Sequence, residues 1–498
     1  MIPDVEVAIV GTGFSGLGMA IQLEKEKRRS YVVLERADDV GGTWRDNHYP
    51  GCACDVPSHL YSFSFEPNPD WSRTYAPQAE ILAYLRRCAD KYGVRPRIRF
   101  RSTVERAELD ERAGLWRVRL EGGETVTARH LVLGIGALSR PARPSIAGLE
   151  TFAGRTFHSA EWDHACDLGG RSVAVVGTGA SAIQFVPRIA PRVKALHLFQ
   201  RTAPWVLPKM DRRVGAAVRT LFRALPPAQR LYRGALWGLL EATGVGFVVE
   251  PDVMKWAAAA GRRHIARQIR DPELRAKVTP RFVPGCKRIL LANDYYPALD
   301  RDNVEVVTDP IREVVREGIV TADGALRRVD AIIFGTGFRV TERPWPIDIV
   351  GRGGIDLNQA WAKGIEAYRG TTIAGFPNAY HLMGPNTGLG NNSMVFMIEA
   401  QVDYVLQCMR TLDRRGARLA DVLPEAQAAY NARLDRRMAR SVWGTGCQSW
   451  YLDERGRNST LWPGFTSEFW LGTRRMKAGD HVFDPSPSAR SPALDAAP

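Results

Sequence analysis

Two short glycine-rich segments have the residue types and spacing that bind the pyrophosphate of a dinucleotide. They are Gly11-Thr12-Gly13-Phe14-Ser15-Gly16 and Gly177-Thr178-Gly179-Ala180-Ser181-Ala182. Glycines here allow a tight turn and let a pyrophosphate approach the backbone N–H groups at the start of a helix. Because an apolar run precedes each segment and a helical pattern follows it, we expect two dinucleotide-binding βαβ units.

The two units differ in charge where their second strand ends. Glu35 lies 24 residues after Gly11, where a carboxylate accepts hydrogen bonds from ribose hydroxyls. Arg201 and Thr202 stand at the corresponding place in the second unit. A carboxylate there would repel a 2′-phosphate, whereas an arginine would bind it with a charge-assisted contact. The second loop is therefore predicted to bind NADPH rather than NADH, and the first to bind FAD.

The surrounding pattern predicts an α/β fold with two Rossmann-like dinucleotide-binding domains, for FAD and NADPH, and an inserted helical subdomain. Expected elements are strands 5–10, 31–34, 172–176, 196–199, 304–307 and 331–334, an antiparallel meander in 97–133, and helices 15–27 and about 392–412. Predicted domains are FAD 1–140, NADPH 141–340 with a helical insert at about 210–280, a return to the FAD domain over 341–483, and a disordered tail 484–498.

The insert combines many arginines and alanines with one apolar face. That face runs through Val218, Leu221, Phe222, Leu236, Leu239 and Leu240. An apolar helical face is usually buried. We therefore expect the insert to cover the sheet and to wall a hydrophobic substrate tunnel, in preference to touching a membrane surface.

A third motif lies just before the second loop. Phe152, Gly154, His158, Trp162 and Asp163 fit the pattern F-x-G-x-x-x-H-x-x-x-W-[PD], which resembles the fingerprint of type I Baeyer–Villiger monooxygenases. The resemblance implies an NADPH-dependent flavoprotein that uses O₂, through a C4a-peroxyflavin, to convert a ketone to an ester or lactone. In that family the fingerprint lies at the domain link, so His158 is expected to organise domain motion.

Further matches to this family carry the expected site residues. The segment Gly41-Gly42-Thr43-Trp44, continued to Asp55, resembles the pattern G-G-x-W-x-x-x-x-[YF]-P-G-x-x-x-D. By resemblance Gly42, Thr43 and Trp44 contact FAD, Asp55 reaches the isoalloxazine, and Tyr61 lies close by. Lys287 is expected to bind the NADP phosphate, Arg288 to be the catalytic cation held by Asp55, and Trp450 to lie near the nicotinamide ribose. Gly390-Asn391-Asn392 departs from the family, in which His often stands at the middle position.

Three other functions stay open at this point. The nearest is a flavin monooxygenase for nitrogen or sulfur, although such relatives usually lack the ending seen in Trp162-Asp163. A remoter one is an NADPH-dependent disulfide reductase, which needs two cysteines at the flavin, but Cys52-x-Cys54 has neither of the usual spacings. The last is an FAD-bound interaction module without turnover.

The composition of the chain limits the classes of protein to which it could belong. The 498 residues are 45% hydrophobic and 24% charged, typical of a globular protein. The net charge of +14 comes without a basic run interleaved with aromatic residues, so no nucleic-acid partner is expected. Seven scattered cysteines indicate a reduced, cytoplasmic protein without a metal site. No secretion signal or transmembrane helix is expected. The ketone and the oligomeric state are left open.

Overall fold

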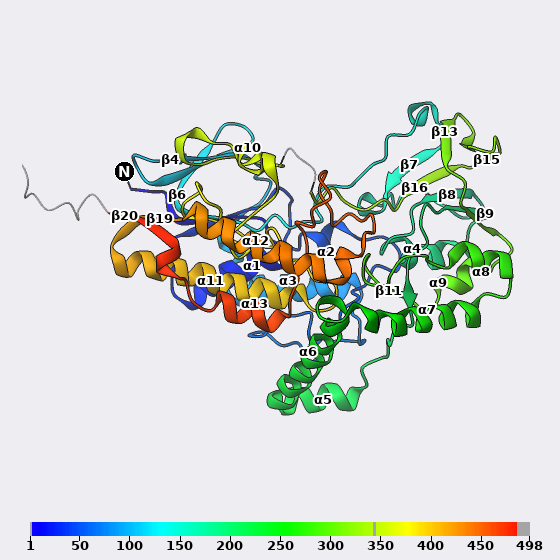
Figure 1. The fold of residues 1–498 in the computed structure, drawn as a ribbon, viewed down its shortest axis with the longest axis horizontal. Coiled ribbons are helices and arrows are strands. Elements are labelled where there is room, and N and C mark those ends of the chain that lie inside the picture. The colour runs from blue at the N-terminus through cyan, green and yellow to red at the C-terminus, as the bar shows by residue number, and fades with distance from the viewer. Residues whose placement is uncertain (1, 342–344, 486–498) are drawn as a thin grey trace, which may run out of the picture.

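A computed structural model describes residues 2–341 and 345–485 of the chain. Two bodies lie side by side, each built around a largely parallel sheet (Figure 1). The amino-terminal and carboxy-terminal parts of the chain form the first body, on the left of the view, and the middle of the chain forms the second. The two sheets agree with the predicted fold class, which is inferred from two βαβ patterns in the sequence.

The first body contains an eight-stranded sheet in the order β17-β4-β5-β6-β1-β2-β3, with β18 also paired to β6. Its strands are β1 (Val5–Val10), β2 (Tyr31–Leu34), β3 (Ile98–Arg99), β4 (Val104–Asp110), β5 (Leu115–Leu120), β6 (Thr125–Leu133), β17 (Asp348–Val350) and β18 (Ala379–His381). Strand β1 pairs in parallel with β2 and β6, whereas β4, β5 and β6 are antiparallel neighbours. The predicted strand pair and meander are therefore confirmed.

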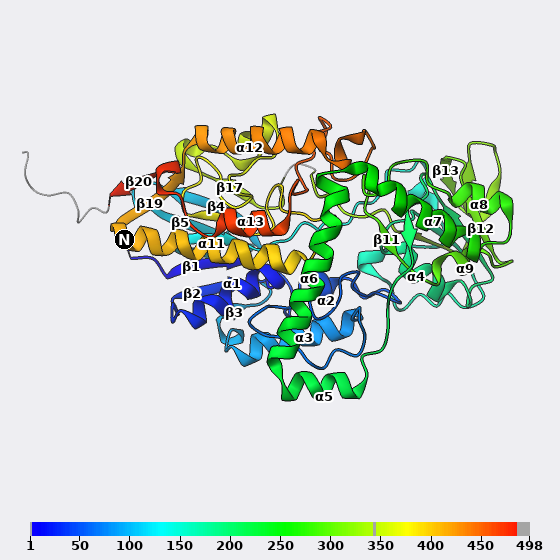
Figure 2. The same ribbon diagram turned by 60° about the horizontal axis from the view of Figure 1, so that its bottom comes forward.

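Helices cover both faces of this sheet. They are α1 (Phe14–Lys25), α2 (Thr43–Asp46), α3 (Gln78–Lys91), α10 (Leu357–Ala360), α11 (Met394–Arg415), α12 (Pro424–Arg440) and α13 (Thr466–Thr473). Helix α11 packs beside α1, which brings the carboxy-terminal part of the chain back onto the first βαβ unit (Figures 1 and 2). It ends at Gly416, whose φ of 59° makes a left-handed cap that favours glycine.

The carboxy-terminal strand corrects one expectation. Strands β19 (Ala417–Val422) and β20 (His481–Pro485) form an antiparallel pair in which Leu419 faces Asp484. Residues 484 and 485 therefore belong to a strand and not to a disordered tail, because β19 supplies them with hydrogen-bonding partners. The rest of the expected tail, 486–498, lies outside the described residues.

The second body contains a five-stranded parallel sheet in the order β12-β9-β8-β16-β7. Its strands are β7 (Arg155–His158), β8 (Ser172–Val176), β9 (Ala195–Phe199), β12 (Val304–Val307) and β16 (Ala331–Phe334). They carry α4 (Ala182–Ile189), α9 (Tyr295–Leu299) and a small antiparallel sheet of β13 (Ile311–Val315), β14 (Gly318–Thr321) and β15 (Leu326–Arg328). Buried strands such as β16 are apolar throughout, as a sheet covered on both faces requires.

The insert is helical, as predicted. It contains α5 (Ala216–Ala224), α6 (Pro226–Val248), α7 (Met254–Gln268) and α8 (Pro272–Val278), flanked by the short pair β10 (Val206–Leu207) and β11 (Leu290–Leu291). Helix α6 crosses in front of the region between the bodies, and α5 projects away from both (Figure 2). The insert therefore spans the two sheets instead of covering the second sheet alone.

Candidate active site between two dinucleotide loops

The first glycine loop closely packs strand β1 against helix α1. Gly11 has a φ of 95°, and a Cβ there would lie 2.7 Å from the carbonyl oxygen of Gly134. A Cβ on Gly16 would lie 1.9 Å from the carbonyl oxygen of Gly11, while Ser15 Oγ donates to Gly134 O. Only glycine fits at these two positions. The loop leaves the N-terminus of α1 free to face a pyrophosphate.

Glu35 is anchored directly beneath this loop. Its side chain is 4% exposed and accepts hydrogen bonds from the Thr12 backbone N–H (3.0 Å) and the Thr12 hydroxyl (2.6 Å). The backbone N–H of Ala37 donates to its other oxygen at 3.0 Å. A fixed carboxylate at the end of β2 is the geometry that ribose hydroxyls require.

The segment that follows Glu35 folds back onto the same loop. Gly41 N–H donates to the carbonyl oxygen of Thr12, and a Cβ on Gly42 would lie 3.0 Å from the Gly13 Cα. Thr43 begins α2, and Trp44 Nε1 donates to the Tyr61 hydroxyl at 3.2 Å. The structure thus brings the predicted FAD residues together around one loop.

The ring of Phe14 completes this group from the start of α1. Its centroid lies 5.2 Å from that of Tyr61, in an edge-to-face arrangement. Burial raises the pKa of Tyr61 well above its ordinary value, so the phenol stays neutral. The apolar bodies of these rings form a wall suited to a planar ligand.

The second glycine loop repeats the backbone geometry of the first. Gly177 has a φ of 107°, and a Cβ there would lie 2.5 Å from the carbonyl oxygen of Gly335. Thr178 Oγ1 donates to the carbonyl oxygen of Thr202 at 3.1 Å, which ties the loop to the end of β9. Gly179, Ala180 and Ser181 then lead into α4, whose N-terminus faces outward.

Two cations gather where the first site has a carboxylate. Arg201 is exposed at the end of β9. Burial and the nearby Arg201 guanidinium both lower the pKa of Lys287. Since a second cation lowers an amine's pKa by repulsion, the two side chains share one electrostatic neighbourhood. Two cations are the donors that a dianionic 2′-phosphate needs, and the contact of Arg201 and Lys287 with NADPH stays a prediction.

A glutamine joins the two nucleotide sites. Gln184 on α4 accepts from the Tyr49 hydroxyl (3.0 Å) and the Ala53 N–H (3.2 Å), and it donates to the carbonyl oxygen of Ala53 (3.0 Å). Gly51 packs against the Gln184 backbone. The turn that leads to Asp55 is therefore held by the second body. The sequence analysis missed Gln184, because nothing local distinguishes it from an ordinary helical residue.

Asp55 and Arg288 form an ion pair between the bodies. Arg288 Nε and Nη2 donate to the same Asp55 oxygen at 2.9 and 2.5 Å, and Nη1 reaches the carbonyl oxygen of Leu389 at 3.4 Å. Burial favours a neutral Asp55, but Arg288 and Lys209 more than offset it, so the pKa of Asp55 lies below its ordinary value. Asp55 in turn raises the pKa of Arg288. The pair therefore stays ionised.

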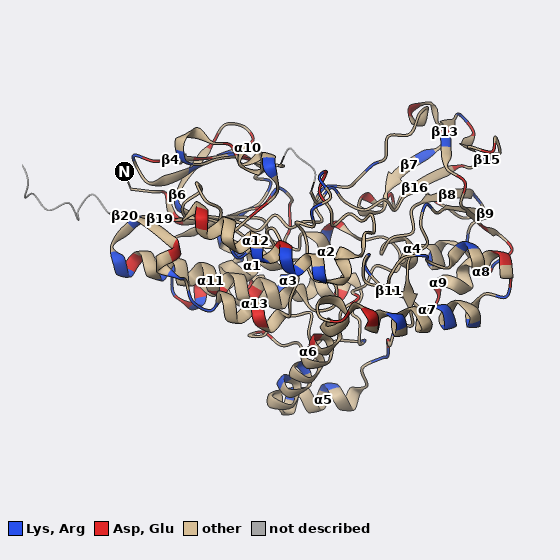
Figure 3. Cartoon of the chain, in the orientation of Figure 1, with Lys and Arg blue, Asp and Glu red and all other residues tan. Residues whose placement is uncertain are grey.

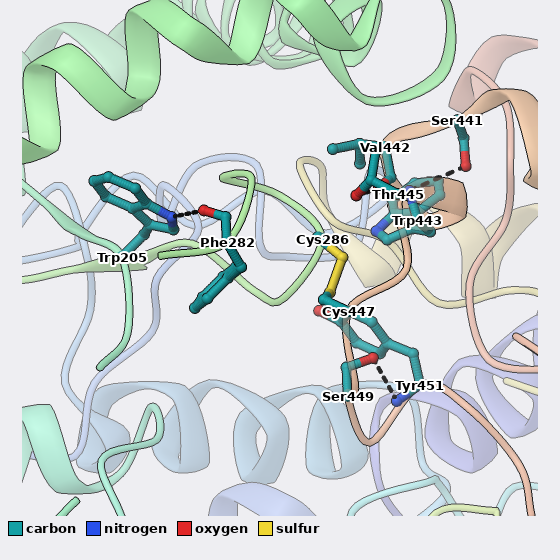
Figure 4. Close-up of a disulfide and its surroundings, with 10 residues drawn as sticks. All are labelled: Trp205, Phe282, Cys286, Ser441, Val442, Trp443, Thr445, Cys447, Ser449 and Tyr451. Carbon is teal, nitrogen blue, oxygen red and sulfur yellow. Dashed lines mark hydrogen bonds between the residues drawn. A yellow bond between two sulfur atoms is a disulfide. The ribbon is translucent and has the colours of Figure 1, made fainter. Parts of the chain in front are cut away.

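A disulfide and a buried tyrosine flank this ion pair. Cys286 is bonded to Cys447, and Tyr451 lies in the same loop (Figure 4). Burial raises the pKa of Tyr451 to about 12, against an opposing effect of Arg288. The expectation of a chain with only reduced cysteines is wrong here. The two cysteines are 161 residues apart and meet only because their loops pack together, which spacing along the sequence cannot reveal.

Trp450 precedes Tyr451, and its ring centroid lies 4.4 Å from that of Tyr451. The Trp450 side chain is 46% exposed. It is therefore not an ordinary core tryptophan, and it faces outward from the loop that carries the disulfide. Its contact with the nicotinamide ribose stays a prediction.

The fingerprint residues lie on the second body, beside the link. Phe152 packs against the core under β16, and a Cβ on Gly154 would lie 2.3 Å from the carbonyl oxygen of Asp330. Trp162 packs its ring 5.2 Å from that of Phe185 on α4, and Asp163 caps the following turn through Ala165 N–H.

His158 lies beside the segments in which the chain crosses between the two bodies. It is fully buried at the end of β7, and its ring lies 5.8 Å from that of Phe338. Phe338 forms a bridge with Pro141, so the two crossing segments are paired at this point. Burial lowers the pKa of His158, which keeps the ring neutral. Its part in domain motion stays a prediction.

The described residues, 2–341 and 345–485, contain no group of three or more His, Cys, Asp or Glu side chains placed to hold a metal ion. No helix among them is long and apolar enough to cross a bilayer.

One dinucleotide loop in each body and an ion pair that joins the bodies are typical of a pyridine-nucleotide-dependent flavoprotein oxidoreductase. Comparison with known proteins agrees. Residues 8–224 match the family described as pyridine nucleotide-disulphide oxidoreductase. A Baeyer-Villiger monooxygenase of Pseudomonas aeruginosa is 52% identical over 97% of this chain and 92% of its own length. One of Streptomyces coelicolor is 51% identical over 97% and 94%.

Solved structures give the same assignment. An oxidized steroid monooxygenase bound to NADP superposes with a TM-score of 0.86 at 33% identity, covering 97% of this chain and all of that one. A closed cyclohexanone monooxygenase gives 0.87 at 29% identity, covering 98% of this chain. The chain belongs to the Baeyer–Villiger monooxygenase family of flavoproteins. The predictions of family, fold class, enzyme class and the cofactors FAD and NADPH are thereby confirmed.

Proposed function

We propose that this enzyme uses NADPH and O₂ to convert ketones to esters or lactones at the Asp55–Arg288 pair. The observation that carries the proposal is the position of Arg288, which comes from the NADPH-binding body and binds Asp55 of the FAD-binding body. A permanent cation thus lies between the two bodies, where the two cofactors would meet. Bound FAD would supply the reduced flavin that activates O₂.

The ion pair suits the charge that such a reaction develops. Because its pKa is raised, Arg288 cannot lose its proton at a working pH. Asp55 binds the Nε and Nη2 edge and leaves Nη1 turned toward Leu389 O. A guanidinium held in this way can stabilise an anionic oxygen without reorganising, which is the largest electrostatic contribution in many enzymes.

The second nucleotide site supports NADPH as the reductant. Arg201, Thr202 and Lys287 would bind the 2′-phosphate, and Gly177–Gly179 and the start of α4 would bind the pyrophosphate. Glu35 and the Gly11 loop would bind FAD. We place the reaction in the cytoplasm, where NADPH is supplied.

The alternatives have less support. Cys52 and Cys54 are buried and unpaired, and burial raises the pKa of Cys52 to about 11, so neither provides a thiolate for disulfide reduction. Oxygenation of nitrogen or sulfur needs no cation beside the oxidant. The Asp55–Arg288 pair favours ketones over these substrates.

A panel of linear, cyclic, aryl and steroid ketones, offered beside sulfides and amines, tests the proposal. With a suitable ketone the yellow holoenzyme should consume NADPH and O₂ in equal amounts and form an ester or lactone, identified by mass spectrometry. Oxygenation of the sulfides and amines with every ketone untouched would support the nearest alternative instead.

A further inference from the structure

Helix α6 turns two of its charged side chains, Arg233 and Glu241, toward the protein. Glu241 accepts from the N–H and hydroxyl of Ser467, each at 2.8 Å, and from the Thr466 hydroxyl at 2.6 Å. Arg233 donates to the carbonyl oxygens of His59 and Leu60. A surface helix normally does the reverse, with its apolar side inward.

The opposite side of α6 is apolar and exposed. Leu231 is 77% and Leu239 is 64% exposed, and the small residues Gly234, Ala235 and Ala242 near them are also exposed. Neighbouring α5 exposes Val218 and Leu221, and Leu225 joins the two helices. We call these five residues, Val218, Leu221, Leu225, Leu231 and Leu239, the α5–α6 face.

This exposure corrects the expectation that the apolar side of the insert is cover. Phe222 is buried, and Leu236 and Leu240 pack against the core of the first body. Val218, Leu221 and Leu239 do not. The sequence showed one apolar face, whereas α5 and α6 project from the body (Figure 2) and α6 presents apolar residues on both sides.

Arginines occur along α5, along α6 and in the segment that precedes them (Figure 3). Between Arg212 and Val249 the chain has six arginines and a single acid, Glu241, which is turned inward. Arg212, Arg213, Arg223 and Arg230 are exposed, and Arg223 is paired with Asp70 of the first body. An apolar surface rimmed by cations is complementary to an anionic lipid bilayer, whose headgroups carry the opposite charge.

We propose that the α5–α6 face docks this enzyme on the surface of a membrane that contains anionic lipid. The leucines would enter the boundary between headgroups and acyl chains, and the arginines would contact phosphates. A second copy of the chain fits less well, because a symmetric contact would bring two sets of arginines together. The contact is peripheral, since none of the described helices can span a bilayer.

Docking would also place the membrane beside the candidate active site. The inner side of α6 presents Phe247, which packs against Gly285 and Gly390. Gly285 lies three residues before Arg288. Gly390 follows Leu389, whose carbonyl oxygen accepts from Arg288 Nη1. Apolar ketones that partition into lipid would then be concentrated near the candidate active site. This consequence rests on the proposed function, whereas docking itself does not.

Cosedimentation of the holoenzyme with vesicles tests the proposal without any ketone. Vesicles of phosphatidylglycerol and phosphatidylcholine should bind the protein, pure phosphatidylcholine vesicles should bind it weakly, and salt should release it. The double variant Leu231→Gln/Leu239→Gln should lower the affinity at least about tenfold, because two leucines leave the lipid. Arg230→Gln should lower it about fivefold on anionic vesicles alone.

Ile355→Gln is the matched control. Ile355 is also an exposed aliphatic residue, but it precedes α10, at the edge of Figure 1 opposite to α5. The affinity of the Ile355→Gln variant for vesicles should stay at the wild-type value. All variants should keep their FAD and the wild-type melting temperature. Equal binding by the wild type and the double variant would overturn the proposal. So would a concentration-dependent dimer that the leucine substitutions abolish, since the face would then bind a second copy.

Discussion

The two nucleotide sites share a backbone but differ in charge. In the first, Glu35 is buried and fixed by Thr12 and Ala37, whereas in the second Arg201 is exposed beside Lys287. The glycine loops supply the same N–H groups in both. We therefore propose that the residue at the end of the second strand selects which nucleotide is bound, whereas the loop binds the pyrophosphate that both nucleotides share.

The sites also differ at the third small position of the loop. Gly16 approaches Gly11 so closely that a Cβ would lie 1.9 Å from its carbonyl oxygen. In the second loop this position is Ala182, whose side chain is buried. The first loop therefore has no room for a side chain at this position, whereas the second accommodates a methyl group.

The largest effect is expected for Gly16→Ala. The added methyl must displace the loop, so the variant should lose FAD binding and most of its stability. Flavin content after purification and the melting temperature measure this. Ala182→Gly is the control and should keep FAD, at a cost of at most about 1 kcal/mol. A Gly16→Ala enzyme with full flavin content would contradict the proposed packing.

Next in size is the cation that lies between the sites. Arg288→Ala should keep FAD, because Arg288 touches neither loop, and should lower kcat about a hundredfold to a thousandfold. Arg288→Lys should recover part of the rate, since an ammonium lacks the planar fork that Asp55 binds. Steady-state ketone turnover per bound flavin measures both. A near wild-type rate in Arg288→Ala would remove this residue from catalysis.

A smaller effect is expected at the second site. Arg201→Ala should raise KM for NADPH about tenfold to a hundredfold and leave KM for NADH nearly unchanged, because only NADPH has the 2′-phosphate. Thr202→Ala is a useful comparison. It removes the Thr202 hydroxyl but keeps the backbone oxygen that accepts from Thr178. Equal changes for both nucleotides in Arg201→Ala would end the contrast drawn between the two sites.

The smallest effect concerns a histidine pair that joins the two bodies. His48 Nδ1 lies 2.8 Å from His164 Nε2. Burial and the neighbouring His164 lower the pKa of His48 below its ordinary 6.5. A depressed folded pKa gives stability that is complete above the unfolded value and is lost as the pH falls below it.

The melting temperature should therefore fall slightly between about pH 7.5 and pH 5 in the wild type, and less in His48→Gln. His164→Gln should lessen the fall by a smaller amount, because it removes the repelling partner but leaves the burial that lowers the pKa of His48. Differential scanning fluorimetry across this range measures the difference. Parallel curves for the three proteins would show that the pair does not sense pH.

The sequence predicts those features of the site whose residues lie close together along the chain. The loops, Glu35 and Arg201 lie within single βαβ units, whose geometry is set over about thirty residues. The meeting of Asp55 with Arg288 came from a family resemblance and agrees with their observed contact. Gln184, Tyr451 and the Cys286–Cys447 bond depend on loops far apart in sequence, so no local pattern could indicate them.

The predicted apolar side of the insert is only partly buried, for a different reason. Periodicity tells which residues share a face of a helix, but not whether protein covers that face. Helix α6 contacts the first body through Arg233 and Glu241 as well as through Leu236 and Leu240, and this orientation leaves Leu231 and Leu239 outside.

The central claim is that one oxygen atom of O₂ enters beside a ketone carbonyl under the control of Arg288. Turnover of an accepted ketone under isotopically labelled O₂, followed by mass spectrometry of the product, tests it most directly. The account predicts an ester or lactone with a single labelled oxygen at the new ether-type position, and almost no product from Arg288→Ala. An unlabelled product, or a labelled one formed equally well by Arg288→Ala, would contradict it.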